Sequence, residues 1–217
     1  MSSVVSFVRQ GHEILGWYGA EPDDPCGTAP VEAIAQVART CYRSASRGGD
    51  SDCRLVRSLV ERDHGAMLEH SFLSVRFLTD RAVANEIVRH RLFSFAQEST
   101  RYVNYGRRGF EFVLPEGLGG AQDAVVRIAC RRAAEEYDAL LSQGASPQVA
   151  RAVLPLCTAT TIVVSGNFRE WRHFLKLRTA PDAHPQMRAL AIPLLDELRR
   201  VVPVVFDDIL TEEGVDA

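Results

Sequence analysis

Lysine is almost absent from this chain. Lys176 is the only lysine among 25 lysine and arginine residues, which leaves 24 arginines. A phosphate group bound to this protein would therefore be held by arginine side chains, helix N-termini or backbone amides. The two commonest nucleotide-binding signatures, G-x-G-x-x-G and G-x-x-x-x-G-K-S/T, are also missing. Any nucleotide site in the chain must have another design.

Cysteine pairs at metal-binding spacing are missing as well. The chain has an odd number of cysteines, and no two of them have the C-x-x-C spacing: Cys26, Cys41, Cys53, Cys130 and Cys157. This pattern disfavours both a disulfide framework and a zinc ribbon, and it predicts reduced thiols that mostly serve packing. His64 and His70 are six residues apart, about 120° around a helix, so we expect no metal site there.

The chain has neither an excess of positive charge nor a long apolar run. Its formal net charge of −3 argues against general attraction to nucleic acid or to an anionic membrane. No apolar run approaches the roughly 20 residues that span a bilayer, and the first residues do not resemble a signal peptide. No G-x-S-x-G motif supports a serine nucleophile. We expect a cytoplasmic protein with no nucleic-acid and no membrane partner.

What the chain does have is a mixed order of helical and strand patterns. With 217 residues, 46% of them hydrophobic, it can bury one substantial core, so we expect a single domain over residues 1–217. Alternating or β-branched runs predict strands at 3–11, 71–79, 110–115 and 157–166. Helical periodicity predicts helices at about 31–43, 51–63, 80–89, 117–144, 147–155, 168–178 and 184–203. Because these elements do not alternate regularly, we expect an α+β fold, with a mixed or antiparallel sheet packed with long helices.

Short polar residues stand where several of these helices should begin. Ser51 and Asp52 can cap the second predicted helix, Asp80 the third, and Asn167 the helix that starts at 168. Ser146, which precedes a proline, is a further start signal.

The most unusual stretch is RHRLFSFAQESTRY, residues 89–102. Its Arg-His-Arg triplet ends a predicted helix, where the helix dipole favours cations. Adjacent helical residues point about 100° apart, so the three cannot all face one pocket unless they touch different ligands or subunits. If the chain is extended from Gln97 on, Gln97, Ser99 and Arg101 lie on one side, a set suited to a phosphate and a polar heterocycle. The residues alone leave three interpretations open: an anion site, a solvated helix end or structural ion pairs.

The same stretch contains Arg-His-Arg, then seven residues, then Ser99. This arrangement resembles the signature of the flavin-dependent thymidylate synthases. Further blocks that resemble the family occur in the family's order: ARTCYRS at 38–44, HGAMLEHSFLSVRF at 64–77, RYVNYGRRGFEFVLP at 101–115, VARAVLPL at 149–156 and GNFREWRHFLKLRTAPDAHPQMR at 166–188. The resemblance therefore covers most of the chain.

In that family a homotetramer binds FAD at subunit junctions, with dUMP stacked on the flavin ring. The resemblance implies the same assembly here, and it puts nine residues at FAD positions: Ala66, Arg89, His90, Arg91, Gln97, Asn167, Phe168, Arg169 and His173. Ala66 replaces a Thr or Ser of some members, so only its backbone could serve the flavin. Ala96 stands where many members have Asn or Ser, and a polar flavin contact is lost there. For Asn167, a helix cap is the alternative or additional role.

The resemblance also implies a substrate site. The positions that match dUMP contacts are Glu86, Arg89, Gln97, Glu98, Ser99, Thr100, Arg101, Arg151 and Arg178. Arg178 matches the arginine held near the uracil ring, where a cation would favour negative charge at N3 or O2 and raise the nucleophilicity of C5. We therefore predict that Arg178 is the catalytic residue. Ser99 has no histidine base beside it in the sequence, so we assign it to binding.

The implied reaction transfers a one-carbon unit from 5,10-methylenetetrahydrofolate to dUMP, with reduced FAD as hydride donor and NADPH as the reductant of the flavin. The protein would then be a methyltransferase that needs no metal. Two alternatives stay open. One is a related flavoprotein that acts on another pyrimidine nucleotide. The other is a non-catalytic nucleotide- or RNA-binding module, which the acidic net charge and the lack of interleaved aromatic platforms disfavour.

Overall fold

The computed structural model describes residues 3–17, 28–41, 43–46 and 48–211. Cys26 and Tyr42, which belong to the patterns above, lie outside these residues. Within them the chain divides into two compact units, the first with residues up to 12, 76–89 and 95–163, the second with 13–75, 90–94 and the residues from 164 on. The long strands β3 (Phe72–Asp80) and β6 (Ala159–Asn167) contribute residues to both units.

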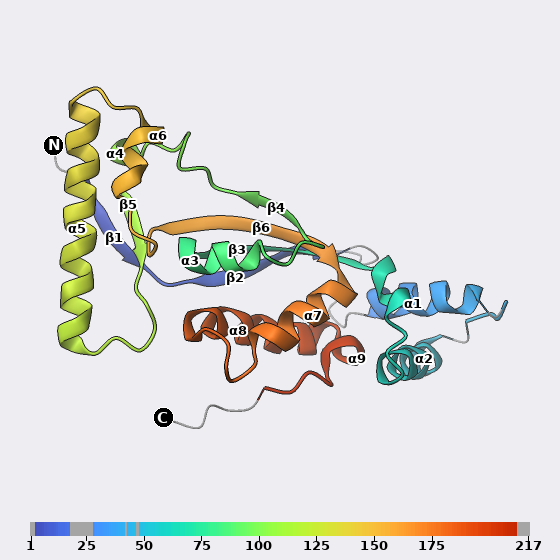
Figure 1. Cartoon of the computed structure of the whole chain (residues 1–217). Helices are drawn as coiled ribbons and strands as arrows, with labels where there is room; N and C mark the ends of the chain where they lie inside the picture. Colours follow the sequence, from blue (N-terminus) through green and yellow to red (C-terminus); the bar gives the residue numbers. More distant parts are fainter. Residues whose placement is uncertain (1–2, 18–27, 42, 47, 212–217) are drawn as a thin grey trace. The chain divides into compact units, whose positions relative to one another are not determined.

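The strands form two sheets. β1 (Val5–Val8) and β5 (Phe110–Val113) make a parallel pair, and the other sheet has the order β2-β3-β6-β4, with β2 at Gly11–Trp17 and β4 at Ser94–Gln97 (Figure 1). Burial alternates along β3 and β6, as expected for strands that pack one face. The strands predicted in the ranges of β1, β3, β5 and β6 are confirmed. β2 and β4 were not predicted.

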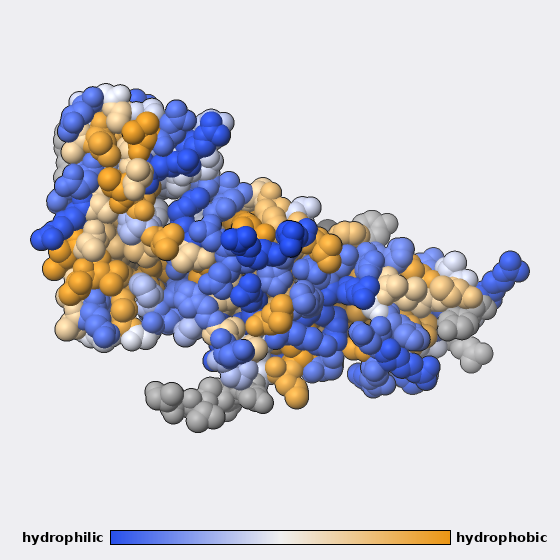
Figure 2. Space-filling view, viewed as in Figure 1, coloured by the Kyte–Doolittle hydropathy of each residue, from blue (hydrophilic) through white to orange (hydrophobic). Residues whose placement is uncertain are grey.

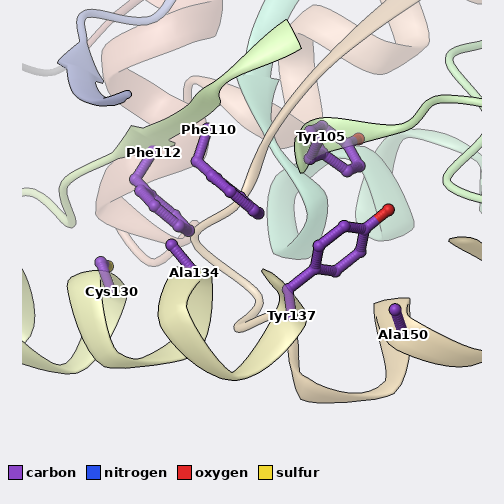
Figure 3. Close-up of a cluster of buried hydrophobic side chains, with 7 residues drawn as sticks. All are labelled: Tyr105, Phe110, Phe112, Cys130, Ala134, Tyr137 and Ala150. Atoms are coloured by element: carbon purple, nitrogen blue, oxygen red, sulfur yellow. The ribbon is translucent and has the colours of Figure 1, made fainter. Parts of the chain in front are cut away.

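In the first unit, α5 (Gly120–Ser142) covers an aromatic core (Figure 3). Tyr137 of α5 packs edge-on against Phe110 and Tyr105, with ring centroids 5.3 and 6.0 Å apart. Cys130 of the same helix lies in this cluster, and its sulfur is 3.4 Å from that of Cys157. The other helical segments of this unit are α3 (Arg81–Ile87), α4 (Tyr105–Arg108), α6 (Pro147–Ala150) and the 3₁₀ segment η2 (Arg151–Val153).

In the second unit, α7 (Phe168–Arg178) is the central helix and packs against α8 (Pro185–Val201) and the 3₁₀ segment η1 (Gly65–His70) (Figure 1). Trp171 is fully buried and donates its indole N–H to the Leu73 carbonyl over 3.0 Å, and its ring packs at a tilt against Phe93, with centroids 4.6 Å apart. The remaining helices of this unit are α1 (Thr28–Thr40), α2 (Gly49–Glu61) and α9 (Pro203–Phe206).

Two of the predicted caps are confirmed. The Asp80 carboxylate accepts the Val83 N–H over 2.7 Å at the start of α3. The Asn167 side-chain oxygen accepts the Glu170 N–H over 2.9 Å at the start of α7. Ser146 does stand at the N-cap of α6, but its side chain makes no capping hydrogen bond.

The cap predicted at Ser51 and Asp52 is wrong. The N-cap of α2 is Gly48, so both residues lie inside the first turn of the helix. Asp52 is buried and serves another purpose: its carboxylate accepts hydrogen bonds from Arg39, at 2.7 Å, and from Ser46, at 2.6 Å. These partners hold the pKa of Asp52 below its usual value, the Ser46 hydrogen bond having the largest effect. Asp52 therefore links α2 to Arg39 of α1 and does not cap α2.

The described residues form both helices and sheets without regular alternation, which confirms the predicted mixture of helices and strands. The parallel β1–β5 pair and the antiparallel bridge between Phe112 and Thr158 make the strand directions mixed, as expected. None of the described helices combines the length and the apolar character that crossing a bilayer requires.

Candidate active site

The Arg-His-Arg triplet forms a turn directly after α3. The helix ends at Ile87, and the Arg89 N–H donates to the Glu86 carbonyl over 3.1 Å. Arg89 and Arg91 are exposed, whereas His90 is only 5% exposed. The environment of His90 therefore differs from that of the two arginines, in agreement with the expectation that the three neighbouring residues do not all face one pocket.

His90 is the centre of a buried polar cluster in the second unit. Arg178, at the end of α7, donates its Nε–H to His90 Nε2 over 3.0 Å. On the other side of the ring, His90 Nδ1 lies 3.5 Å from a carboxylate oxygen of Glu170. The ring of Phe174 packs edge-on against the imidazole, with centroids 4.9 Å apart.

The imidazole of His90 is neutral in this environment. Its pKa is lowered to about 4. Burial has the largest effect on this pKa, and the nearby charges of Arg178 and His173 add to the lowering. Because Nε2 accepts the Arg178 hydrogen bond, the ring proton is on Nδ1 and faces Glu170. The contact with Glu170 is thus one between a neutral ring and a carboxyl group whose own pKa is raised by burial. It is not a salt bridge.

His90, Glu170 and His173 place three potential metal ligand atoms within 4.8 Å of one another. A metal ion would need a free lone pair on His90, yet Nε2 accepts from Arg178 and Nδ1 carries the proton. The guanidinium of Arg178 would also repel a divalent cation at this position. The arrangement therefore favours a hydrogen-bonded cluster over a metal centre.

Three of the predicted cofactor residues line one cavity. Asn167, Arg169 and His173 surround a hollow of about 550 Å³, together with Leu92 and Glu69. The Arg169 guanidinium donates to the Glu69 carboxylate over 2.6 Å, although both side chains are about half exposed. Arg169 and His173 are four residues apart on α7, so they lie on one face of the helix.

Arg169 also borders a second hollow, of about 350 Å³, whose wall includes the predicted cofactor residue Ala66. A Cβ atom at Gly65 would meet Arg169 Nε at 2.8 Å, so the absence of a side chain lets the arginine lie against η1. Ala66 itself is exposed and offers a methyl group, so only its backbone can make a polar contact there.

The side chain of Phe168 lies in the core, where it cannot contact a ligand. It is fully buried and packs against Phe206, with ring centroids 5.6 Å apart. Its backbone N–H donates to the Ser71 carbonyl over 2.9 Å. Any contact of Phe168 with a cofactor would have to use its backbone carbonyl, because the side chain belongs to the core.

Ser99, Thr100 and Arg101, three of the predicted substrate residues, lie in a turn that follows β4. β4 ends at Gln97, and the Tyr102 N–H donates to the Ser99 carbonyl over 3.1 Å. The Ser99 hydroxyl also accepts the Arg101 N–H over 3.3 Å. The extended chain that would put Gln97, Ser99 and Arg101 on one side is therefore not formed, because the Ser99 side chain offers the backbone a local alternative to strand pairing.

Arg151 joins this turn from far along the chain. Its terminal guanidinium nitrogen donates to the Thr100 hydroxyl over 3.1 Å, across 51 residues of sequence. Thr100 is buried, whereas Arg151 and Arg101 are exposed. The structure thus brings together two predicted substrate residues, Arg151 and Thr100, while the Arg101 guanidinium lies over the Tyr102 ring, 5.5 Å from its centroid. Glu86, another of the predicted substrate residues, is half-buried on α3.

Two further predicted residues are held by partners that sequence reasoning missed. Gln97 donates to the Thr160 hydroxyl over 3.3 Å, and Glu98 accepts the Tyr105 O–H over 2.8 Å. Burial, and then Glu98, raise the pKa of Tyr105, so its phenol stays protonated as a donor. Thr160 looks like an ordinary β-branched strand residue in the sequence, so no local signal marks it. No local signal in the sequence marks Glu170 as a neighbour of His90 either.

The predicted residues thus form two sets. Those assigned to the substrate lie in the first unit, apart from Arg178, and the cofactor residues other than Arg89 and Gln97 lie in the second. That the two sets converge on shared ligands remains a prediction.

Comparison with known proteins places this geometry in a family. Residues 27–204 match the family model described as thymidylate synthase complementing protein. The chain belongs to this family. The matched range contains the Arg-His-Arg turn, the turn at Ser99 and the whole of α7. Membership therefore covers every residue of both predicted sets.

Relatives and a solved structure agree with this family. The chain is 34% identical over 210 residues to a flavin-dependent thymidylate synthase of Corynebacterium efficiens, covering 86% of this chain and 82% of the relative. It is 36% identical over 213 residues to that of Mycobacterium marinum, covering 87% and 84%. The fold is similar to a UMP/dUMP methylase, PolB, from Streptomyces cacaoi, solved with 5-Br dUMP, at a TM-score of 0.77 and 24% identity over 93% of this chain and 95% of that one.

Proposed function

We propose that this protein is a flavin-dependent thymidylate synthase, a methyltransferase that converts dUMP to dTMP with 5,10-methylenetetrahydrofolate as carbon donor. The observation that carries the proposal is the Arg-His-Arg turn, with Ser99 after seven further residues, inside a family match that spans residues 27–204. The named relatives of this family are flavin-dependent thymidylate synthases. We propose NADPH as the reductant and the cytoplasm as the location, in a single catalytic domain over residues 1–217.

The residues of the second unit fit an FAD. Asn167, Arg169 and His173 give the larger hollow amide, guanidinium and imidazole groups, which suit a diphosphate or the polar edge of a flavin. The second hollow has apolar walls, including Leu59 and Met67, that suit an aromatic ring. We propose that these residues hold FAD, with Ala66 and Phe168 contributing backbone atoms, and Arg89, Arg91 and Gln97 reaching it from the signature stretch. When bound and reduced by NADPH, FAD would supply the hydride that completes the methyl group.

The first unit offers groups for the nucleotide. Arg151 places an exposed guanidinium beside the Thr100 hydroxyl, and Arg101, the next residue in the chain, is also exposed, a combination that suits a phosphate. We propose that these groups and Ser99 bind the phosphate of dUMP, with Glu86, Gln97 and Glu98 completing the substrate site. The Ser99 hydroxyl accepts a backbone N–H in the turn, which supports a binding role and not a nucleophilic one.

Arg178 is the proposed catalytic residue. A guanidinium beside the uracil ring would stabilise negative charge at N3 or O2, and this would raise the nucleophilicity of C5 toward the one-carbon unit. Its Nε is fixed by His90 in the structure, so the guanidinium does not sample many orientations. The chain's own contribution to the reaction is to orient the pyrimidine, polarise it and exclude water.

We also propose that neighbouring copies complete the site in a homotetramer. Leu92 and Tyr102 are both 79% exposed next to predicted ligand residues, and Arg89 and Arg91 are exposed as well. Apolar residues gather along α5 in Figure 2, where Val125 is 67% exposed and Ile128 49%. A contiguous exposed apolar patch, such as the one along α5, is typical of a surface that a partner covers.

The test is the release of tritium from dUMP labelled at C5, in the presence of FAD, NADPH and 5,10-methylenetetrahydrofolate. Formation of the new bond at C5 requires the C5 hydrogen to leave, so we expect release together with dTMP. The same assay with labelled UMP separates dUMP from another pyrimidine nucleotide as the substrate. A protein that takes up FAD but releases no tritium from dUMP would overturn the proposed reaction, and one that takes up no FAD would favour a non-catalytic binding module.

Replacement of Arg178 by alanine tests the catalytic assignment. We expect Arg178→Ala to retain flavin and to lower tritium release roughly 100-fold or more, the usual effect of deleting a group that stabilises developing charge. Lys176→Ala is the matched control, because Lys176 is an exposed cation on the same last turn of α7. It should keep normal release. Normal turnover in Arg178→Ala would refute the role of this residue.

A further inference from the structure

His90 faces into its own unit, although the signature to which it belongs is assigned to the cofactor. Its side chain is only 4% exposed, and it is enclosed by Arg178, Glu170, Phe93 and Phe174. A side chain so placed has little surface left for a ligand. Its two polar atoms are already directed at residues of α7.

The hydrogen bond from Arg178 reaches His90 through Nε and not through the end of the fork. A bond at Nε fixes the plane of the guanidinium and hence the directions in which its terminal nitrogens donate. An arginine side chain otherwise carries considerable rotamer entropy, about 2 kcal/mol. Arg178 also stands at the last position of α7, next to the C-cap Thr179, where the helix itself restrains it least.

The third member of the arrangement is Glu170. It stands on the Nδ1 side of the imidazole, at 3.5 Å, and it is as buried as His90. A carboxyl group there favours the tautomer with the proton on Nδ1, which leaves Nε2 free to accept from Arg178. Glu170 belongs to the first turn of α7 and Arg178 to the last, so His90 bridges two ends of one helix.

We infer that His90 is a positioning residue, which orients the catalytic guanidinium of Arg178 through Nε2, while Glu170 holds the imidazole in the tautomer that can accept. This inference rests on the proposed function, in which Arg178 acts on the pyrimidine. It assigns His90 a role through Arg178 in place of direct contact with FAD. Arg89 and Arg91, the exposed members of the triplet, remain the residues for the ligands.

A double-mutant cycle tests the inference, with His90→Leu and Arg178→Ala made singly and together. The readouts are the affinity for dUMP, from the change that dUMP causes in the flavin spectrum, and tritium release in the variants that retain it. We expect His90→Leu alone to lower tritium release by roughly 10- to 100-fold, since a misplacement of about 1 Å can cost that much. Flavin content should stay close to that of the unmodified protein.

The decisive result is the coupling. If His90 acts through Arg178, His90→Leu should weaken dUMP binding in the unmodified protein and have no further effect in the Arg178→Ala background, because residues that act as a unit are not additive. Equal effects in both backgrounds would overturn the inference. So would a loss of flavin as the main defect of His90→Leu, because that outcome assigns His90 to the cofactor.

Two further variants separate positioning from folding. His90→Gln keeps an acceptor that can reach Nε, so it should restore part of the turnover that His90→Leu loses. Phe174→Leu removes the aromatic contact of 4.9 Å with the imidazole but no polar partner. It should lower the melting temperature while folded protein keeps its turnover. If His90→Gln is no better than His90→Leu, the acceptor is not what matters and the inference is wrong.

The failure of this inference can be told apart from the failure of the proposed function. An unmodified protein that releases no tritium from dUMP refutes the function itself. Normal release in the unmodified protein, with additive effects of His90→Leu and Arg178→Ala, refutes only the positioning role.

Discussion

Arg151 and Thr100 meet through one hydrogen bond of 3.1 Å, and both belong to the proposed phosphate site. Hydrogen bonds to charged groups are worth about 1.5–3 kcal/mol, so removal of Arg151 should weaken dUMP binding roughly 10- to 100-fold. We expect this loss in Arg151→Ala, measured by calorimetry on the FAD-loaded protein, and a smaller loss in Arg151→Lys, which keeps the charge without the fork. Arg132→Ala, an exposed arginine of α5, is the control. An unchanged affinity in Arg151→Ala would remove this residue from the substrate site.

The burial of neutral His90 should also make stability depend on pH. Its folded-state pKa of about 4 lies below the ordinary histidine value of about 6.5, so the unfolded chain takes up the proton first. The contribution of neutral His90 to the free energy of unfolding is therefore complete above about pH 6.5. It is lost as the pH falls from about 6.5 to about 4. The other titratable groups around the ring are Arg178, Glu170 and His173, all on α7.

Urea unfolding of the unmodified protein and of His90→Gln, at pH 7 and pH 5, measures this contribution. The unmodified protein should lose more stability between these two values than the variant does, because glutamine does not titrate. An imidazole of His90 that titrates near pH 6.5 in an NMR experiment would contradict the predicted direction.

At the scale of elements, β6 and the segment after the Arg-His-Arg turn depend on a close approach at Gly166. A Cβ atom there would lie 2.2 Å from a ring carbon of Phe93, and Phe93 in turn packs on Trp171. Gly166→Ala would push this ring away, and since overpacking a core costs about 1–3 kcal/mol, we expect a loss of that size in the free energy of unfolding.

Gly11→Ala is the matched control for this prediction. Gly11 also lies in a strand, β2, but no atom lies within 4 Å of a Cβ built there. Chemical unfolding should therefore find little change. Equal stability of the two variants would show that the contact between Phe93 and Gly166 does not constrain β6.

At the scale of the whole molecule, the family resemblance implies the proposed assembly of four chains, and the exposed apolar residues offer surfaces that neighbouring chains could cover. Light scattering on the FAD-loaded protein should give a mass near four times the 24.0 kDa of one chain. Val125→Asp combined with Ile128→Asp places charge on the exposed face of α5 and should lower this mass, because unpaired charges are costly to bury. Glu136→Lys, also exposed on α5, should not.

Flavin content provides a second readout of the same assembly. If neighbouring chains complete the cofactor site, variants that dissociate should also release FAD. A monomer that keeps FAD and full turnover would contradict the proposed site between copies.

The sequence by itself determined the features that depend only on residues close together in the chain. Strand β3 follows from alternation, and the starts of α3 and α7 follow from Asp80 and Asn167, because a cap needs only the next three residues. The signature stretch marked the candidate site, and its resemblance supplied the family to which residues 27–204 belong. These features are local, so they survive in a one-dimensional pattern.

Only the tertiary structure decided which distant side chains share a partner. Asp52 looks like a cap in the sequence, but Arg39 and Ser46 take its carboxylate. The chain after Gln97 forms a turn at Ser99 and not an extended run, and no local pattern indicates that Arg178 donates to His90 across 88 residues. Burial decides such pairings, because a polar atom removed from water must find a partner wherever the fold brings one.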